Sequence, residues 1–267
     1  MNKLRQPPIF TIEDTTFLVD TDRQVLRQTN DPGNEISFIN HMQDHGTHYR
    51  LLYDLDAHCA AEDLFDQTRV KVIDIPQLTE LDPEGMSEKY SVPVDQLAGK
   101  TDFEVIVDQQ LLTARHNGIM PQIRIMDDCF HVVLKAHELW PAGHWGPNIN
   151  LGNLTISDDG SCYEGYYHPV LKSVVEIDAK LIELPDHIVR IKIPHELRLD
   201  PVFAAQIYGM DEREVLRRHP IQKELKAGVI PLSETHIPAL IRQNREQLQQ
   251  AHKENARRAK PRIRPRF

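Results

Sequence analysis

Apolar and polar residues alternate along several short stretches of the chain, which is the pattern of half-buried β-strands. In residues 8–19, Phe10 and Ile12 precede a polar turn, and Phe17 and Val19 follow it. The same alternation recurs in residues 49–53, 70–75, 121–132, 154–167, 173–177 and 188–193. The pattern therefore predicts short antiparallel strands arranged as meanders. In residues 162–167, Tyr163 and Tyr167 should face one side of a strand and Tyr166 the other.

An internal repeat is the strongest feature of the sequence. Residues 193–208 match residues 75–90, since Ile, Pro, Leu, Asp, Pro and Tyr recur in register 118 positions apart. The hairpins in residues 8–19 and 121–132 match at an offset of 113. The change of offset requires five extra residues in the second copy, and the stretch rich in turn formers at 141–147 is where we expect them. The chain is predicted to be one module written twice.

Each predicted meander ends in short helices. Asp82 and Asp200 are good N-cap residues, and Pro83 and Pro201 occupy the first helical position, where a missing N–H is tolerated. Short helical segments are expected to follow at residues 94–98, 109–116 and 211–218. A final helix should run from about residue 237 to about residue 258, with a thin apolar stripe.

The predicted fold class is therefore α+β, with two tandem repeats, each an antiparallel β-meander followed by short helices, and then a C-terminal helix and a basic tail. The first repeat is assigned to residues 1–118 and the second to 119–231. The C-terminal helix takes residues 232–258, and residues 259–267 are predicted to be a disordered tail because they are rich in Pro and Arg.

Composition restricts the class of protein. The three cysteines (Cys59, Cys129, Cys162) are odd in number and widely spaced, which argues against a disulfide framework and favours a reducing compartment. We recognise no secretory signal at the start and no apolar run of about 20 residues, the length that would span a bilayer. A cytoplasmic location without a membrane partner is the expectation.

Charge is distributed unevenly along the chain. Residues 242–267 carry nine Lys/Arg and two Glu, a local charge of +7, so the remaining body has 22 basic and 38 acidic residues and a charge near −16. Such a tail attracts phosphates whereas the body repels them. Arg257, Arg258, Arg262, Arg264 and Arg266 are therefore candidate nucleic-acid contacts, with a solubilising terminus as the alternative.

The helix pair predicted in residues 201–220 resembles the layout of a DNA-binding helix-turn-helix, with Ala205, Gly209 and Val215 at the fifth, ninth and fifteenth positions. In that interpretation Ala204, Tyr208 and Met210 are buried, and Arg213 and Arg217 are candidate nucleic-acid contacts. Arg218 stands where an apolar residue is usual, and acidic residues surround the arginines. Structural packing of two short helices is the alternative.

Three histidines form a candidate metal site. His41, His45 and His48 lie at i, i+4 and i+7, which would place them on one helical face. Gly46 argues against a continuous helix, and the Glu of a metalloprotease helix is missing between them. A solvated polar loop is the alternative interpretation.

The sequence gives little support to an enzyme: we find no phosphate loop, nucleophile elbow or kinase signature, and we assign neither catalytic residues nor a cofactor. The function expected first is a non-enzymatic intracellular binding or scaffolding protein built from the duplicated module, with a protein as partner. The alternative is a nucleic-acid-associated accessory protein that uses the tail and the helix pair. A metal-dependent enzyme using the three histidines is the weakest of the three.

Overall fold

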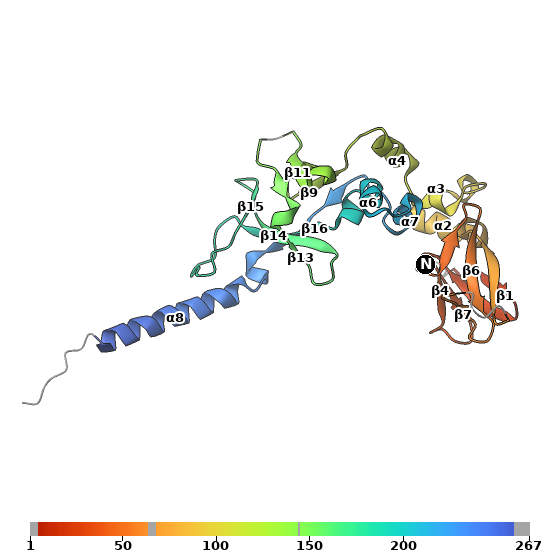
Figure 1. Ribbon diagram of the computed structural model, residues 1–267, viewed down its shortest axis with the longest axis horizontal. Helices are drawn as coiled ribbons and strands as arrows, with labels where there is room; N and C mark the ends of the chain where they lie inside the picture. The colour runs from red at the N-terminus through yellow and green to blue at the C-terminus, as the bar shows by residue number, and fades with distance from the viewer. Residues whose placement is uncertain (1–4, 64–67, 144, 259–267) are drawn as a thin grey trace, which may run out of the picture. The chain divides into compact units, whose positions relative to one another are not determined.

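The computed structural model describes residues 5–63, 68–143 and 145–258 and divides the chain into two compact units (Figure 1). Unit 1 comprises residues 1–117 and 205–222, and unit 2 comprises residues 118–204 and 223–267. The structure is 30% helix and 31% strand, with antiparallel sheets followed by helices and a C-terminal helix, which confirms the predicted α+β class. Residues 205–222, assigned to the second repeat from sequence, group with unit 1 in the structure.

Unit 1 contains two antiparallel sheets. The first is a meander of β1 (Ile9–Ile12), β2 (Thr15–Asp20), β3 (Val25–Gln28) and β4 (Glu35–Ser37). The second consists of β5 (Met42–Asp44), β6 (His48–Asp54), β7 (Cys59–Ala60) and β8 (Val70–Pro76). β6 is central, because β5 and β7 pair with successive parts of one side of it and β8 pairs with its whole length on the other.

The core of unit 1 lies between these sheets. Alternate residues of β6 are buried, as the period of two requires, so that Tyr49 and Tyr53 face inward. Their rings make edge contacts with Phe38 and Phe17, at centroid distances of 5.2 and 6.4 Å respectively. The Tyr49 hydroxyl donates to the buried carboxylate of Asp102, 2.7 Å away. The face of the second sheet that carries Tyr49 and Tyr53 therefore packs in the core, and its opposite face is available for other contacts.

The helices of unit 1 follow the second sheet. They are α1 (Leu78–Leu81), α2 (Pro83–Tyr90), the 3-10 helix η1 (Val94–Gln96), α3 (Asp102–Ile106), α4 (Gln109–His116) and, from later in the chain, α7 (Glu212–Arg218). Asp82 caps α2 as predicted, accepting from the backbone N–H of Gly85. Its carboxylate also accepts from Arg5 and Thr21, so one buried side chain joins three segments.

Unit 2 has the same two-sheet plan with one additional strand on each sheet. The first sheet holds β9 (Gln122–Ile125), β10 (Asp128–Val133), β11 (Glu138–Pro141), β12 (Ile149–Asn150) and, parallel to β9, β17 (Leu225–Lys226). The second holds β13 (Thr155–Ile156), β14 (Cys162–His168), β15 (Ser173–Val175), β16 (Val189–Pro194) and β18 (Gly228–Pro231).

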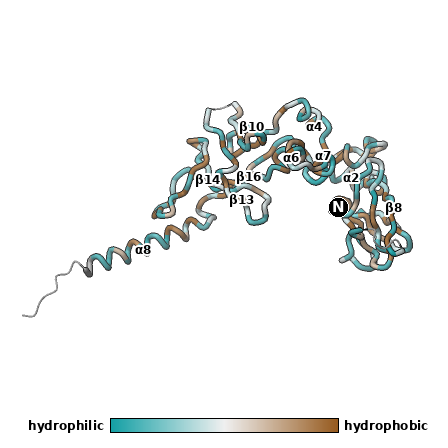
Figure 2. The backbone as a smooth tube through the Cα atoms, in the orientation of Figure 1, coloured by the Kyte–Doolittle hydropathy of each residue, from teal (hydrophilic) through white to brown (hydrophobic). Residues whose placement is uncertain are grey.

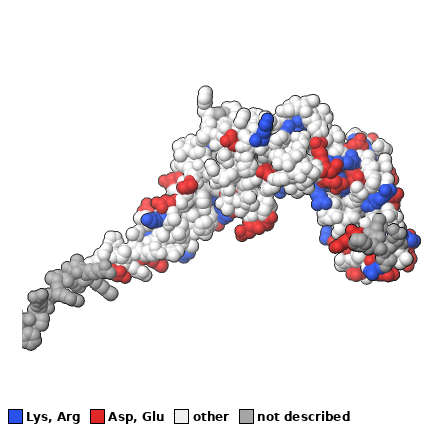
Figure 3. All heavy atoms as spheres, in the orientation of Figure 1, with Lys and Arg blue, Asp and Glu red and all other residues white. Residues whose placement is uncertain are grey.

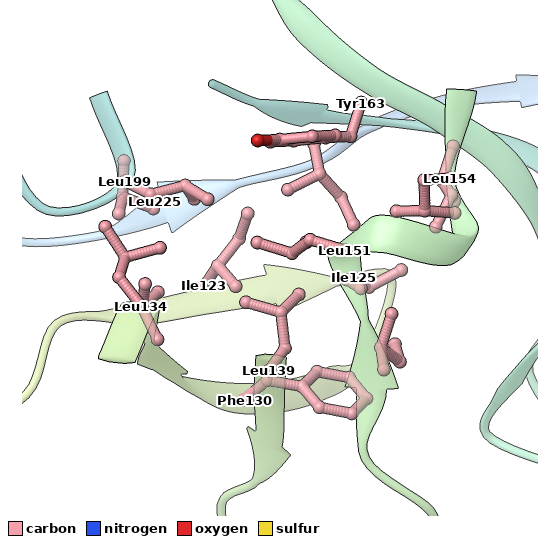
Figure 4. Close-up of a cluster of buried hydrophobic side chains, with 14 of the residues drawn as sticks. Ile123, Ile125, Phe130, Leu134, Leu139, Leu151, Leu154, Tyr163, Leu199 and Leu225 are labelled. Atoms are coloured by element: carbon pink, nitrogen blue, oxygen red, sulfur yellow. The ribbon is translucent and has the colours of Figure 1, made fainter. Parts of the chain in front are cut away.

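Side chains from both sheets and from helix α5 (Glu196–Leu199) meet in the core of unit 2 (Figure 4). Ile123, Phe130 and Leu139 come from the first sheet, and Tyr163 comes from β14. Tyr163 and Tyr167 are buried whereas Tyr166 faces the other side, as the alternation predicted. Each unit therefore has its own hydrophobic core.

The remaining helices of unit 2 lie at the loops and at the end of the chain. They are the 3-10 helices η2 (Leu134–Ala136), η3 (Leu151–Asn153) and η4 (Leu232–Glu234), then α6 (Pro201–Tyr208), which runs across the division between the units, and α8 (Ile237–Arg258). The bounds of α8 match the prediction. Figure 2 shows apolar positions interleaved with polar ones along it, as expected of a helix with one thin apolar stripe.

Backbone details recur between the two units. Residues with positive φ stand at matching places in the following pairs: Glu13 and Met126, Gln24 and His137, Gly46 and Gly160, His58 and Lys172. The central strand pairs also share a register, since Tyr49 lies opposite Ile75 and Tyr163 opposite Ile193. These agreements in turn position and register support a duplicated module; the duplication itself stays a prediction.

The extra residues of the second copy do not lie where we expected them. The offset of 113 continues past residues 141–147, because Ile36 of β4 matches Ile149 of β12. It becomes 114 after the β5–β6 turn, where His48 matches Cys162, and 118 after β7, where Pro76 matches Pro194. The additional residues are thus one in a hairpin turn and four in the loop between β15 and β16, positions at which surface loops tolerate insertion.

Replacing Asp82 should test how far the buried cap stabilises unit 1. Asp82→Ala removes a cap, takes the acceptor from the Thr21 hydroxyl and leaves Arg5 with only the longer contact to Glu88, so the free energy of unfolding should fall by about 2–4 kcal/mol. Asp108, an exposed cap of α4 that accepts from Gln110 and Leu111, is the matched control, and Asp108→Ala should cost about 1 kcal/mol or less. Urea denaturation of the full chain measures both, and equal losses would contradict the assignment.

Candidate functional site

Strand β8 leaves one of its edges open. Its residues pair with β6, and no second strand lies beside it in the parts of the chain that the structure describes. The carbonyl of Leu52 accepts from Ala61 on the far side of β6, so the backbone of Val72, opposite Leu52, points away from β6. The same alternation turns Asp74 outward. These unpaired N–H and C=O groups form a template for an added strand.

A groove lies on the outer face of the same sheet. It has a volume of about 890 Å³, and Leu52, Ala60 and Val72 contribute apolar side chains to it. Glu35, Gln43 and Arg50 add polar groups. The Val72 side chain is 49% exposed. The open edge and the groove therefore adjoin at Val72.

On the corresponding surface of unit 2, the end of the chain pairs with the strand edge and borders a groove of about 610 Å³, which Glu164, Tyr166 and Arg190 help to line. β18 pairs antiparallel with β16, with Ile230 opposite Arg190 and Gly228 opposite Lys192. Next, η4 and the start of α8 place Leu232, Ile237 and Ile241 in a small apolar cluster. Tyr166, the counterpart of Leu52 at an offset of 114, packs against this cluster. One sheet thus carries a strand and a helix that the other lacks.

The charges flanking the two surfaces are reversed. In unit 1, Arg50 on β6 donates to Asp74 on β8 at 3.0 Å. In unit 2 the acid is on the central strand, where Glu164 pairs with Lys192 at 2.9 Å and with Arg190. Hydrogen bonds from Arg50 lower the pKa of Asp74, and those from Lys192 and Arg190 lower the pKa of Glu164. Both carboxylates are therefore ionised at neutral pH, and the two surfaces present different charge patterns to a partner.

Helix α7, the candidate recognition helix, holds its arginines against unit 1. Arg217 is 3% exposed; it donates to the Phe38 carbonyl at 2.7 Å and lies over the Tyr49 ring. Arg213 donates to Asp44 at 2.9 Å and lies over the Phe103 ring. Both arginines approach the buried carboxylate of Asp44. In this arrangement Arg217 offers no exposed face to a phosphate, and Arg213 is largely occupied by packing.

The helix pair around α6 and α7 agrees only in part with the helix-turn-helix layout. Gly209 has a φ of +62° at the turn, and Ala204 is buried, as expected. Tyr208 and Met210, expected to be buried, are 47% and 48% exposed. Ala205 and Val215 are each 1% exposed, whereas the residues around the Gly209 turn are exposed, so the turn contributes little to the buried surface of this pair.

The three histidines lie on a β-hairpin and not on a helix. His41 precedes β5, and its Nδ1 accepts from the backbone N–H of Ser37. His45 and His48 flank the turn at Gly46 and stack on each other at 5.3 Å. Within the described ranges, no group of three His, Cys, Asp or Glu residues is arranged to hold a metal ion. The i, i+4, i+7 spacing therefore does not produce a shared ligand face here.

The five arginines proposed for the tail are not described at side-chain level. Arg257 and Arg258 belong to the last turn of α8, and Arg262, Arg264 and Arg266 lie outside the described residues. On the described part of α8, Arg242, Arg245 and Lys253 are offset by Glu246 and Glu254. Over the visible face of unit 1, basic and acidic side chains are interspersed (Figure 3). That face of unit 1 does not concentrate the positive charge that nucleic-acid binding uses.

Comparisons with protein-family models, with curated proteins and with solved structures found no match. Among the helices in the described portion, none is both long and apolar enough to cross a membrane. Strand β8 was not singled out from sequence, because alternation shows which face of a strand is buried and not whether its edge is paired. The signal was present in the two Gly-x-x-Pro segments at 118–121 and 228–231, which occupy similar places after the helices.

Amide hydrogen exchange should distinguish the open edge from the covered one. At low micromolar protein, the amides of Val72 and Asp74 should exchange at least about tenfold faster than those of Arg190 and Lys192, which face β18. NMR-detected exchange on the full chain gives the four rates. Equal protection at the two pairs would show that the edge of β8 is covered in solution.

Replacing Asp44 should loosen the attachment of α7. Asp44→Ala removes the carboxylate shared by Arg213 and the buried Arg217 and leaves Arg217 with Glu214, 2.9 Å away, so stability should fall by about 1–3 kcal/mol in urea denaturation. Arg213→Ala is the comparison, and it should cost less because its side chain is 36% exposed. A loss below about 1 kcal/mol for Asp44→Ala would contradict the role given to this carboxylate.

Proposed function

We propose that the chain is a non-enzymatic binding or scaffolding protein and that unit 1 captures an extended segment of a partner protein. The observation that carries the proposal is the contrast between the outer edges of the two second sheets: β18 pairs with the edge of β16 and the start of α8 borders the groove of unit 2, whereas among the described residues no strand pairs with the edge of β8 beside the groove of unit 1. A strand added to a free edge supplies main-chain hydrogen bonds, and side chains entering the groove supply selectivity.

The partner segment is defined by the chemistry of this surface. A strand antiparallel to β8 would pair its backbone with Val72 and Asp74. An apolar side chain opposite Val72 would enter the groove over Leu52 and Ala60. Arg50 and Asp74 already neutralise each other, so uncharged residues on either side of that apolar residue would fit best. The segment is therefore short, extended and apolar at its centre.

The nucleic-acid alternative receives less support from the described residues. Two of its seven arginines, Arg213 and Arg217, are held by Asp44, and the rest lie at the end of the chain. The metal alternative has no convergent ligand set in the described hairpin. A protein segment is the partner class that the geometry favours.

Selection from a displayed library of random peptides tests the proposal. Peptides that bind the full chain should lose at least about tenfold in affinity against Val72→Lys, because an ammonium group would project into the apolar part of the groove and repel added strands. Ile9, 65% exposed on β1, provides the control variant Ile9→Lys, which should bind as the parent does. Fluorescence anisotropy gives the affinities. A library that yields no binder sensitive to Val72→Lys would refute the proposal.

A further inference from the structure

The chain contains two copies of a short segment, and only one of them forms a strand; in the other, the Pro121 carbonyl accepts from the backbone N–H of Val132. Residues 228–231 (Gly-Val-Ile-Pro) form β18 and cover β16. Residues 118–121 (Gly-Ile-Met-Pro) repeat the pattern of glycine, two apolar residues and proline, but they form no strand. Ile119 is 64% exposed and Met120 is 42% exposed. Two large apolar side chains thus stand adjacent in solvent on a connecting segment.

There are two Gly-x-x-Pro segments and two corresponding strand edges, those of β16 and β8. β16 and β8 are corresponding strands at an offset of 118, as Pro194 and Pro76 show. β16 is covered by one Gly-x-x-Pro segment. β8 is uncovered among the described residues, and the second Gly-x-x-Pro segment is exposed. The pairing of β18 with β16 therefore shows how a Gly-x-x-Pro segment could pair with the outer edge of β8.

We infer that a second copy of this chain covers β8 with its residues 118–121. This inference rests on the proposed function and names the partner that unit 1 captures. The segment adds antiparallel to β8, in the register that β18 uses on β16. Gly118 lies opposite Asp74, Ile119 opposite Ile73, Met120 opposite Val72 and Pro121 opposite Lys71.

The side chains suit this register. Met120 is brought onto the Val72 side of the sheet, where its flexible thioether enters the groove above Leu52. Ile119 falls beside Ile73 on the opposite face. Pro121 lies at the end of the added strand, where its missing N–H interrupts no inner ladder. The segment therefore supplies an apolar side chain that packs against the apolar part of the groove.

Glycine at the first position has a physical reason in residues 118–121. At Gly228 an added Cβ would make only an ordinary van der Waals contact, 3.4 Å from the Cβ of Lys192 on β16. Gly118 faces the larger demand, since its φ is +88° in the segment that forms no strand and must become extended when the segment pairs with β8. Only glycine populates both regions without strain. The residue thus permits the same segment to exist free and paired.

Sedimentation equilibrium of the full chain tests the inference. Four added residues make few hydrogen bonds, so we expect weak association, with a dissociation constant on the order of 10–100 µM. The mean mass should rise from 30.8 kDa at low concentration toward twice that value or more. Met120→Asp should weaken association at least about tenfold. Met126→Asp is the matched control, since Met126 is 40% exposed at a turn and should associate as the parent does.

Disulfide trapping tests the register. One preparation carries Val72→Cys and the other Met120→Cys, both with Cys59→Ser to remove the cysteine that lines the groove. Oxidation of the mixture should give a covalent dimer joined through positions 72 and 120, because paired residues of neighbouring strands lie within disulfide range. A preparation with Ile119→Cys in place of Met120→Cys should give no such dimer, because the side chain at position 119 points to the other face of the sheet. Each preparation oxidised alone is the baseline for reaction through Cys129 and Cys162.

A chain that stays monomeric at several hundred micromolar, or Met120→Asp and Met126→Asp with equal effects, overturns the inference. Peptides selected on the chain that still depend on Val72 would then leave the proposed function standing with another protein as partner. If the chain neither associates with itself nor selects peptides that depend on Val72, the proposed function is refuted as well. The two experiments therefore distinguish failure of the inference from failure of the proposed function.

Discussion

A β-strand has two edges, and the outer edges of β8 and β16 differ in their pairing: β18 pairs with β16, whereas no described strand pairs with the outer edge of β8. The groups on the inner edges of β8 and β16 are satisfied by β6 and β14, and those on the outer edges must find another partner or water. In unit 2 the chain continues back across its own sheet and adds β18. In unit 1 it proceeds through α3 and α4 to the next unit without doing so. The difference lies in the path of the chain after each sheet, not in the sheets themselves.

Buried tyrosine–carboxylate pairs fix which face of each sheet becomes the core. Tyr49 donates to Asp102, and Tyr163 donates to Glu196, each at 2.7 Å. These residues are counterparts on β6 and β14, yet their acceptors come from different helices. Burial raises the pKa of Tyr49 and that of Asp102, and the hydrogen bond between them keeps both polar groups satisfied in the core. A slip of one residue would place both tyrosines outside, so these bonds maintain the register that exposes Leu52 and Val72.

Local signals predicted local structure well. Asp82 with Pro83 marked the start of α2, and the helix with a thin apolar stripe predicted for about residues 237–258 has the observed bounds of α8, because capping and periodicity depend on neighbours in sequence. Contacts between distant residues were not predictable in this way. Arg217 is buried because Phe38 and Asp44, far away in the sequence, surround it, and its own neighbours suggested an exposed basic residue. The prediction of a shared metal-binding face for the three histidines was wrong for a related reason. Side chains at i, i+4 and i+7 lie on one face of a helix, but on a hairpin the same spacing does not bring them together.

The charges along β8 explain how an open edge can avoid random pairing and still select a partner. Asp74, Arg50 and Lys71 lie on or beside the edge, and charged side chains at such positions oppose indiscriminate pairing between sheets. They leave Val72 as the apolar position between them. A segment that adds to this strand must therefore be uncharged where it meets Asp74 and apolar where it meets Val72. Glycine followed two positions later by methionine satisfies both conditions, and the proline after it ends the strand. The features that protect the edge from random pairing are thus the same ones that define the sequence it accepts.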